Sequence, residues 1–422
     1  MSAVLVPVAC DALAERFARV RARTEALAAP ISAEDAMLQS MPEASPAKWH
    51  LAHATWFFEQ FVLARLPGGR ALRPDWSALF NSYYRGAGPA HPRAQRGLLS
   101  RPTLAEVRDY RRALDERVLE LLQRDALDAD ARDVVLLGTH HEQQHQELLL
   151  TDLLHALSQH PRAPAYRADL PVPRGDAVPL TWVRFDEAMV EIGAPPWPGA
   201  AQFAFDNESP RHRALAPACL LASRPVSNAE YRAFVEDGGY RTPALWTSEG
   251  WATVEREGWT RPLYWCADLE HAFTLGGVRA LDPHAPVCHL SYYEADAFAR
   301  WAGARLPTEL EWERAAAVQA PLGRFAEDGV LQPQAGDPAA AGLQQLFGDV
   351  WEWTASAYVP YPGFRPWRGV LGEYNGQFMC GPWVLRGGSC ATPRGHVRAS
   401  YRNFFHPRDR WQFAGLRLAR DP

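Results

Sequence analysis

Residues 140–147 read His-His-Glu-Gln-Gln-His-Gln-Glu and are flanked on both sides by apolar residues. No glycine or proline occurs from Thr139 to Gln159, so this stretch predicts a helix. Residues four apart share one face of a helix, and His141 and His145 can therefore direct two imidazoles toward one point. Imidazole is a common ligand of zinc, copper, iron and nickel. The stretch predicts part of a metal site, with histidines on an ordinary polar helix face as the alternative.

The region around this stretch, roughly residues 5–160, shows helical patterning throughout. Ser45-Pro46 is expected to cap the second helix, and Thr103 to Glu106 form a capping box before the third. A long connection rich in proline and glycine, residues 70–102, separates these two helices. The four predicted helices cover Ala12–Leu27, Trp49–Leu66, Thr103 to about Arg124, and the histidine-bearing stretch. Four helices with one long crossover predict a four-helix bundle, an architecture whose interior often holds a metal.

The second half of the chain shows little helical periodicity. Residues 161–179 are rich in proline, alanine and arginine, which indicates a linker between domain 1–160 and domain 180–422. After the linker, Val226–Val235 and Tyr292–Ala302 are the two convincing helices, and short apolar runs alternate with glycine, proline and tryptophan. The predicted fold class is α+β, with a helical N-terminal domain and a C-terminal domain that has little regular secondary structure.

Composition excludes several classes of protein. The 422 residues are 47% hydrophobic, enough for a core, and the net charge of -5 gives no basic surface for nucleic acid. No run of about 18 apolar residues is present, so no membrane span is expected. The six cysteines lack CxxC spacing, which argues against a disulfide framework and favours a reducing, cytoplasmic setting.

A metal site needs a third protein ligand, and the second predicted helix offers His50 and His53, three residues apart on one side. Three histidines from two helices would leave coordination positions open for catalysis. A carboxylate-bridged di-iron site with Glu142 and Glu147 as ligands is an alternative; it would also need a glutamate from each of two other helices, for which Glu59 is available, but the repeated Glu-x-x-His motif is missing. The letters of the zinc-protease motif HExxH also occur, with Glu142 as the glutamate.

The crossover between the second and third predicted helices carries further polar residues. Tyr83 and Tyr84 could pack in the loop, or could supply a proton or an electron to a metal–oxygen unit. Arg93 and Arg96 are three residues apart and could together hold a carboxylate or a phosphate. The alternative is a solvated loop with ordinary arginines.

Both halves of the chain resemble one known family, the iron-dependent sulfoxide synthases of ergothioneine biosynthesis and the related selenoneine synthases (EgtB/SenA). In the first half the matching residues are Ser45-Pro46, Trp49-His50-Leu51-Ala52-His53 and His141-Glu142-Gln143-Gln144-His145, which resemble a DinB-like domain. The second half is similar to a formylglycine-generating-enzyme (C-type-lectin-like) domain. It matches at Phe205–Pro210, Pro225–Tyr231, Trp301–Glu309, Gly348–Trp353 and Leu385–Ser389. The resemblance covers nearly the whole chain.

The resemblance implies an oxidoreductase that uses Fe(II) and O2 to form a C–S or C–Se bond. The bond would form at the carbon between the ring nitrogens of hercynine. The donor would be cysteine or γ-glutamylcysteine for sulfur, or a selenosugar for selenium. By the same resemblance the iron ligands are His53, His141 and His145; the substrate-binding residues are Gln144, Asn403, Phe404 and Phe405; the donor carboxylate is held by Arg93 and Arg96; and Tyr83 or Tyr84 is the catalytic acid.

One departure from the pattern argues against formylglycine chemistry. Copper-binding cysteines of formylglycine-generating enzymes follow the Arg-Gly-Gly-Ser phrase at a distance, whereas Cys390 directly follows Ser389 and has no second cysteine after it. Two further alternatives stay open: a binding module without catalysis, and a DinB-type thiol transferase or metal hydrolase. The binding module predicts no bound iron, and the transferase or hydrolase leaves the second domain unexplained.

Overall fold

The computed structural model describes residues 10–422, which form two compact units. The first unit holds the described residues up to Pro161 together with two short segments, Trp197–Phe203 and Pro366–Asn375. The second unit consists of Arg162–Pro196, Ala204–Arg365 and Gly376–Pro422. The sequence placed both short segments in the C-terminal domain, but their contacts group them with the helices. The ring of Phe203, for example, stacks on His140 at 3.9 Å.

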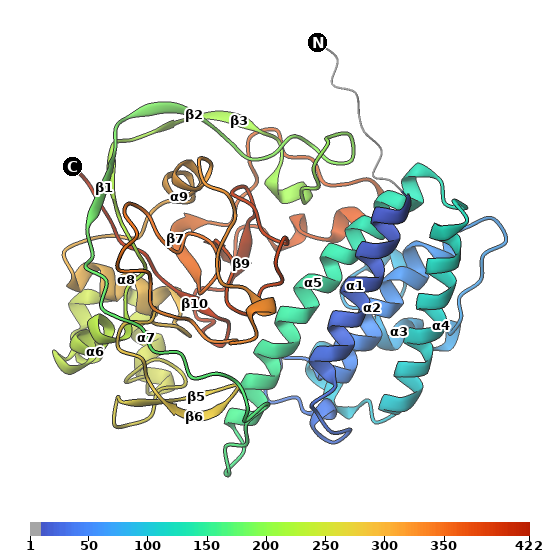
Figure 1. Cartoon of the computed structure of the whole chain (residues 1–422), viewed down its shortest axis with the longest axis horizontal. Coiled ribbons are helices and arrows are strands. Elements are labelled where there is room, and N and C mark those ends of the chain that lie inside the picture. The colour runs from blue at the N-terminus through green and yellow to red at the C-terminus, as the bar shows by residue number, and fades with distance from the viewer. Residues whose placement is uncertain (1–9) are drawn as a thin grey trace. The chain divides into compact units, whose positions relative to one another are not determined.

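The first unit is built on four long helices, as predicted. They are α1 (Cys10–Ala28), α2 (Ala47–Phe61), α4 (Leu104–Gln123) and α5 (Ala129–Ser158). In Figure 1 these blue to cyan helices run alongside one another. The predicted capping box before α4 is confirmed, because the Thr103 side chain accepts from the Glu106 backbone and the Glu106 side chain accepts in return. The helix α5 begins at Asp128, whose carboxylate accepts from the backbone N–H of Ala131.

The expected cap of α2 is wrong in one respect. The N-cap residue is Pro46, and no side chain caps the helix. The Ser45 hydroxyl instead accepts a hydrogen bond of 2.8 Å from the guanidinium of Arg96. A buried arginine needs partners for its donors, and it takes the hydroxyl that would otherwise satisfy the helix end.

The connection from α2 to α4 is ordered by short helical turns. They are η2 (Leu63–Arg65), η3 (Pro74–Trp76), α3 (Ser77–Phe80), η4 (Arg85–Ala87) and η5 (Arg93–Leu98). The buried carboxylate of Glu59 accepts from the backbone N–H groups of Leu72 and Arg73, at 2.6 and 2.9 Å. Glu59 is therefore committed to holding this connection against α2, which argues against the di-iron alternative.

One core cluster of the bundle gathers apolar side chains from all four long helices. It is made of Leu13, Phe17, Phe58, Val62, Leu63, Leu114, Val118, Leu121, Leu122, Leu127 and Val135. Gly138 on α5 allows the close approach of α2, since a Cβ at this position would lie 2.3 Å from the ring of Phe58. Phe58 is fully buried, so its ring has little room to move. The glycine thus brings α2 within reach of the histidines one turn further along α5.

The second unit is a compact α+β domain with four small sheets. Its helices are α6 (Asn228–Glu236), α7 (Ser248–Glu257), α8 (Tyr292–Trp301) and α9 (Glu309–Ala316). One sheet orders its strands β1 (Trp182–Phe185), β4 (Cys219–Ala222) and β11 (Ala419–Arg420). Another has the order β10 (Ala414–Gly415), β7 (Trp351–Ala357), β8 (Trp383–Arg386) and β9 (Asn403–Phe405). The two-stranded pairs are β2 (Ala188–Ile192) with β3 (His212–Ala216), and β5 (His271–Thr274) with β6 (Gly277–Ala280).

The predicted helices near residues 226–235 and 292–302 are present as α6 and α8, whereas α7 and α9 were not predicted. The reason in α9 is that charged residues occupy inward positions. Glu309 is buried against Arg386 and Arg402, at 2.8 and 2.9 Å. Buried acidic residues hide the apolar periodicity by which a helix is recognised in a sequence.

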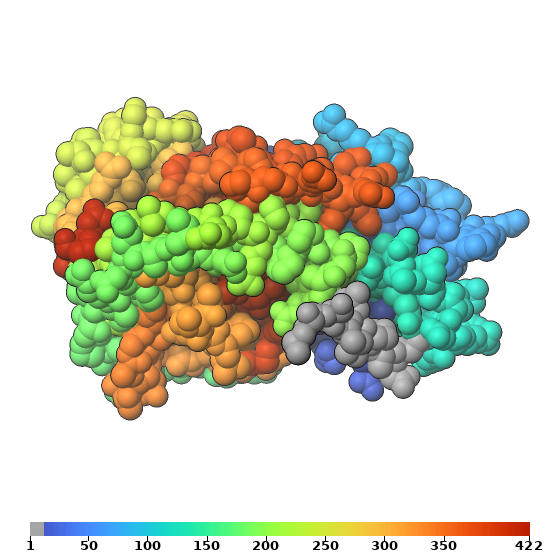
Figure 2. All heavy atoms as spheres, turned by 90° about the horizontal axis from the view of Figure 1, so that it is seen from above, coloured from blue at the N-terminus to red at the C-terminus, as the bar shows by residue number. Residues whose placement is uncertain are grey.

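The β2–β3 ribbon is the most exposed apolar part of the second unit's sheets. Met189 and Leu215 face each other across it and are 53% and 56% exposed. Figure 2, seen from above, shows the green atoms of this region on the near surface. Within residues 10–422, no helix is long and apolar enough to cross a membrane.

The close crossing of α2 and α5 predicts an unusual response to Gly138→Ala. A Gly-to-Ala change in a helix interior normally stabilises by about 1 kcal/mol. Here the added methyl meets the Phe58 ring, and overpacking of this kind costs about 1–3 kcal/mol, so we expect a net loss of stability. Chemical denaturation of the full chain measures it.

The matched control is the same change in a Phe58→Ala background. The cavity left by the ring then accepts the methyl, and Gly138→Ala should stabilise the protein by about 1 kcal/mol. Stabilisation of the same size in both backgrounds would contradict the close packing.

Candidate metal centre

Three histidines converge at the crossing of α2 and α5. His53 from α2 and His141 and His145 from α5 offer ring nitrogens that all lie within 4.8 Å of one another. The Nε2 atom of His141 is 3.2 Å from that of His53 and 3.1 Å from that of His145. Imidazole nitrogens bind a transition metal at about 2.0–2.1 Å, so one ion could span these separations at angles of roughly 95–105°. The donor set fits a divalent metal.

Burial keeps all three rings neutral. Desolvation lowers the pKa of His141 to about 3, and it lowers the pKa values of His53 and His145 well below the ordinary range. The neighbouring histidines lower the pKa values of His53 and His145 further. A metal binds the neutral imidazole, and these side chains are therefore in the binding form without any cost of deprotonation near pH 7.

The orientation of the His53 ring is fixed by a hydrogen bond and by an aromatic stack. Its Nδ1 lies 2.6 Å from the backbone carbonyl oxygen of Phe80, so this nitrogen donates and leaves Nε2 as the free lone pair. The indole of Trp49 stacks on the His53 ring at 4.4 Å with an angle of 11°. The guanidinium of Arg96 lies over the Trp49 ring, 3.4 Å from its centroid. One ligand is thus fixed by a hydrogen bond and an aromatic stack.

Gln144 contacts a tyrosine that the sequence did not single out. The hydroxyl of Tyr374 donates a hydrogen bond to the side-chain oxygen of Gln144, and its ring lies 5.6 Å from that of His141. Tyr374 belongs to the short segment Pro366–Asn375 of the first unit. It is one of 13 tyrosines and lies 230 positions from Gln144, and no local pattern distinguishes it. Only a prediction of long-range contacts could have found it.

The two loop tyrosines differ in their surroundings. Tyr84 is fully buried, and its ring lies 5.8 Å from Trp56 and 5.2 Å from Phe61. Burial raises its pKa well above the ordinary value. Tyr83 is half-buried, with its ring 4.8 Å from that of Tyr84. Tyr84 has the environment of a core residue, and Tyr83 is the more accessible of the two.

The two arginines of the predicted pair, Arg93 and Arg96, also differ in burial. Arg96 is buried, and it donates to the hydroxyls of Ser45 and Ser82 at 2.8 and 3.2 Å. Desolvation, followed by repulsion from Arg93, lowers the Arg96 pKa to about 9. In the part of the chain that the structure describes, Arg96 forms no ion pair with a carboxylate. Arg93 is exposed and donates to the backbone oxygen of Glu43.

The three predicted substrate-binding residues of the second half lie together on β9. The side-chain oxygen of Asn403 accepts from the backbone N–H of Phe404 at 2.9 Å. The ring of Phe404 stacks on Tyr358 at 4.1 Å, and that of Phe405 lies 5.9 Å from Trp411. All three side chains are partly exposed on the second unit, and their contact with substrate stays a prediction.

Glu142, the glutamate of the HExxH letters, is paired with arginines of α1 and α4. Its carboxylate pairs with Arg21 at 2.8 Å and with Arg111, and it accepts from the Thr24 hydroxyl at 2.6 Å. Burial alone would raise its pKa, but Arg111 and Arg21 lower it to about 2. A general base needs reach to a substrate proton, and Glu142 is fully buried among its partners. Glu142 therefore cannot act as the general base that the zinc-protease alternative requires.

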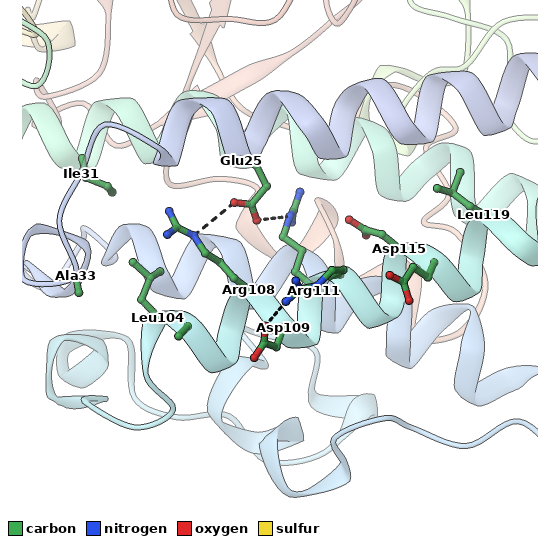
Figure 3. Close-up of a pocket in the computed structure, with 12 residues that line it drawn as sticks. Glu25, Ile31, Ala33, Leu104, Arg108, Asp109, Arg111, Asp115 and Leu119 are labelled. Carbon is green, nitrogen blue, oxygen red and sulfur yellow. Dashed lines mark hydrogen bonds and ion pairs between the residues drawn. The ribbon is translucent and has the colours of Figure 1, made fainter.

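A pocket of about 750 Å³ opens between α1 and α4, on the side of Arg111 (Figure 3). Its charged residues pair with one another, as in the contacts of Glu25 with Arg108 and Arg111 at 3.6 and 3.1 Å. It contains none of the predicted site residues. We therefore assign the site to the histidines and not to this pocket.

Comparison with known proteins agrees with both halves of the fold. The DinB superfamily matches residues 16–149, and the sulfatase-modifying factor enzyme 1-like domain matches residues 186–339 and 318–422. The "Hercynine oxygenase" of Mycolicibacterium thermoresistibile is 36% identical, over 100% of this chain and 97% of the relative. The chain belongs to the hercynine oxygenase family.

Other hercynine oxygenases and a fungal relative extend the match. The "Hercynine oxygenase" of Mycolicibacterium smegmatis is 34% identical over 98% of this chain and 100% of its own. "Ergothioneine biosynthesis protein 1" of Schizosaccharomyces pombe is 29% identical over 52% of this chain and 28% of its own. The predicted family and fold class are confirmed, and hercynine oxygenases are oxidative enzymes, so the protein is an oxidoreductase.

The Glu142 contacts predict a structural effect of Glu142→Gln. Loss of the charge leaves Arg21 and Arg111 poorly compensated inside the bundle, and breaking a buried pair costs about 3–5 kcal/mol. Thermal and chemical unfolding of the variant should show this loss, whereas exposed Glu116→Gln on α4 should change stability by less than about 0.5 kcal/mol. Unchanged stability with lost activity would instead make Glu142 a general base.

Proposed function

We propose that the protein is an ergothioneine-type sulfoxide synthase that uses Fe(II) and O2 to join the sulfur of an amino-acid thiol to hercynine. The observation that carries the proposal is the convergence of His53, His141 and His145 in a chain whose relatives are hercynine oxygenases over their full length. The overall reaction balances: the imidazole C–H and the thiol S–H each lose a hydrogen, and O2 yields one sulfoxide oxygen and one water.

The three histidines would hold the iron through Nε2. When bound, the iron supplies activation of O2 and a coordination position for the donor sulfur. The ligands are neutral, so the bound ion keeps its positive charge, which favours binding of a thiolate. Three protein ligands leave positions open for both reactants.

Arg96 supports an anionic donor. A buried guanidinium without an ion-paired carboxylate among the described residues is expensive to keep charged, and a donor carboxylate would relieve that cost. Cysteine and γ-glutamylcysteine carry such a carboxylate, whereas a selenosugar does not. We therefore place the donor's carboxylate at Arg96, with exposed Arg93 as a secondary contact.

Gln144 and Tyr374 form the polar edge of the site. Gln144 directly precedes the ligand His145 in the sequence. The side-chain oxygen of Gln144 accepts a hydrogen bond from the Tyr374 hydroxyl. An amide in this position can bind an imidazole nitrogen of hercynine and orient the carbon between the ring nitrogens toward the site. Tyr374 is buried like Tyr84, but its hydroxyl donates to Gln144 and its ring lies beside that of His141, so Tyr374 is our candidate for the proton donor.

Product analysis tests the proposed function. Anaerobically loaded Fe(II) protein, given hercynine, O2 and either γ-glutamylcysteine or cysteine, should yield a sulfoxide adduct with the mass of both substrates plus one oxygen atom and minus two hydrogen atoms. His141→Ala should form none, while His271→Ala, at a partly exposed histidine on β5, should match the unaltered protein. Absence of any adduct with both thiols, or an adduct with a selenosugar alone, would contradict the proposal.

Tyr374→Phe tests the proton donor. Removal of a general acid typically lowers kcat by about 10²–10⁴-fold, and we expect this loss with little change in metal affinity. Tyr83→Phe is the comparison and should retain most of the activity. If Tyr83→Phe is the damaging change instead, the role belongs to the loop.

A further inference from the structure

His50 is a buried histidine that stands beside the three converging histidines without joining them. It lies on α2, three residues before His53, and is only 2% exposed. Its Nδ1 is 2.8 Å from Nδ1 of His145, and its Nε2 is 3.1 Å from the Asp152 carboxylate. Asp152, His50 and His145 therefore form one continuous chain of contacts, which we call the Asp152 relay.

The proton positions in the Asp152 relay follow from the chemistry of its members. Two ring nitrogens at 2.8 Å need one donor and one acceptor. Nε2 of His145 faces His141 and must be free of hydrogen to bind a metal, which puts the proton of this neutral ring on Nδ1. His50 then accepts at Nδ1 and carries its proton on Nε2. That N–H donates to the carboxylate, and the aspartate thus determines both tautomers.

Asp152 is itself fixed in place. It follows His145 by two helical turns on the same face of α5 and is 5% exposed. Its Oδ2 also accepts from the backbone N–H of Ser45 at 2.8 Å, immediately before α2 begins. The hydroxyl of the same serine accepts from Arg96. The relay therefore joins the ligand helix to the start of α2 and to the arginine that we place at the donor.

Within the described part of the chain, the hydrogen bonds of the other two ligands lead to no carboxylate. His53 donates to a neutral backbone carbonyl, and Nδ1 of His141 is buried without a hydrogen-bond partner among residues 10–422. A carboxylate behind a ligand imidazole orients the ring and raises its basicity, and loss of such partners typically costs about 10–100-fold in metal affinity. His145 is thus the ligand whose hydrogen-bond chain ends, through His50, on a carboxylate.

We propose that His50 and Asp152 are positioning residues that hold His145 with Nε2 free and turned toward the metal. The inference rests on the proposed metal role of the three histidines. The relay makes His145 the strongest donor of the set, and it couples the orientation of this ligand to Ser45 and Arg96.

The test compares two replacements of His50 in the full chain. His50→Phe keeps the volume and removes the acceptor, whereas His50→Gln keeps an acceptor oxygen for the His145 Nδ1–H. Anaerobic titration with Co(II) and Fe(II), without substrates, should show about 10–100-fold weaker binding for His50→Phe and a smaller loss for His50→Gln. Asp152→Asn should fall between them, and exposed Asp130→Asn on α5 should bind as the unaltered protein does.

A spectroscopic readout separates positioning from loss of structure. The d–d bands of bound Co(II) should shift in Asp152→Asn, whose fold is checked by circular dichroism. If His50→Phe fails to fold, the pair of His50→Gln and Asp152→Asn decides. Metal affinity and Co(II) spectra equal to those of the unaltered protein in these variants would overturn the inference.

These results are distinguishable from failure of the proposed function. Loss of affinity in the relay variants, together with no hercynine product from the unaltered protein, would keep the relay and remove the function. Product formation with unaltered metal binding in the variants would do the reverse.

Discussion

The close crossing of α2 and α5 is the constraint on which the site depends. Gly138 lets the Phe58 ring lie against the backbone of α5, and the next turn of α5 brings His141 opposite His53. The four-residue spacing from His141 to His145 then completes the set on one helix face. A side chain at position 138 would separate the helices, and the separations of 3.1–3.2 Å between ring nitrogens leave little tolerance for this.

Buried charge holds α5 in its rotational position on both sides of the histidines. On one side Glu142 pairs with Arg21 of α1 and Arg111 of α4. On the other, Asp152 receives the Ser45 backbone N–H and contacts His50. Buried ion pairs contribute little net stability against apolar alternatives but are costly to break, so they favour one packing over others. In this protein the favoured packing of α5 fixes the direction in which the imidazoles of His141 and His145 point.

The histidine cluster could be predicted from the sequence because it depends on the local spacing of residues along two helices. His141 and His145 follow from the helical spacing, and His53 was one of two histidines on the one other helix that offered them. The structure distinguishes His53 from His50: His53 belongs to the cluster, whereas His50 contacts Nδ1 of His145 from outside it. Glu142, by contrast, was open to a protease reading, because the letters of a motif do not show on which side of a helix its glutamate finds partners.

Long-range contacts were not predictable in this way. Tyr374 reaches Gln144 from a segment far along the chain, and Ser45 was expected to cap α2 but binds Arg96 instead. In α9, buried glutamates paired with arginines conceal the apolar periodicity. Each of these cases depends on a partner that is distant in sequence, and local propensity carries no information about it.

The proposed function requires one ion bound jointly by His53, His141 and His145. X-ray diffraction at the iron absorption edge, on crystals of the Fe(II)-loaded protein, locates this ion. We expect a single anomalous peak at bonding distance, about 2.0–2.2 Å, from the Nε2 atoms of all three histidines. A peak at the Glu142 carboxylate, or one that contacts fewer than three of these nitrogens, would contradict the proposed function.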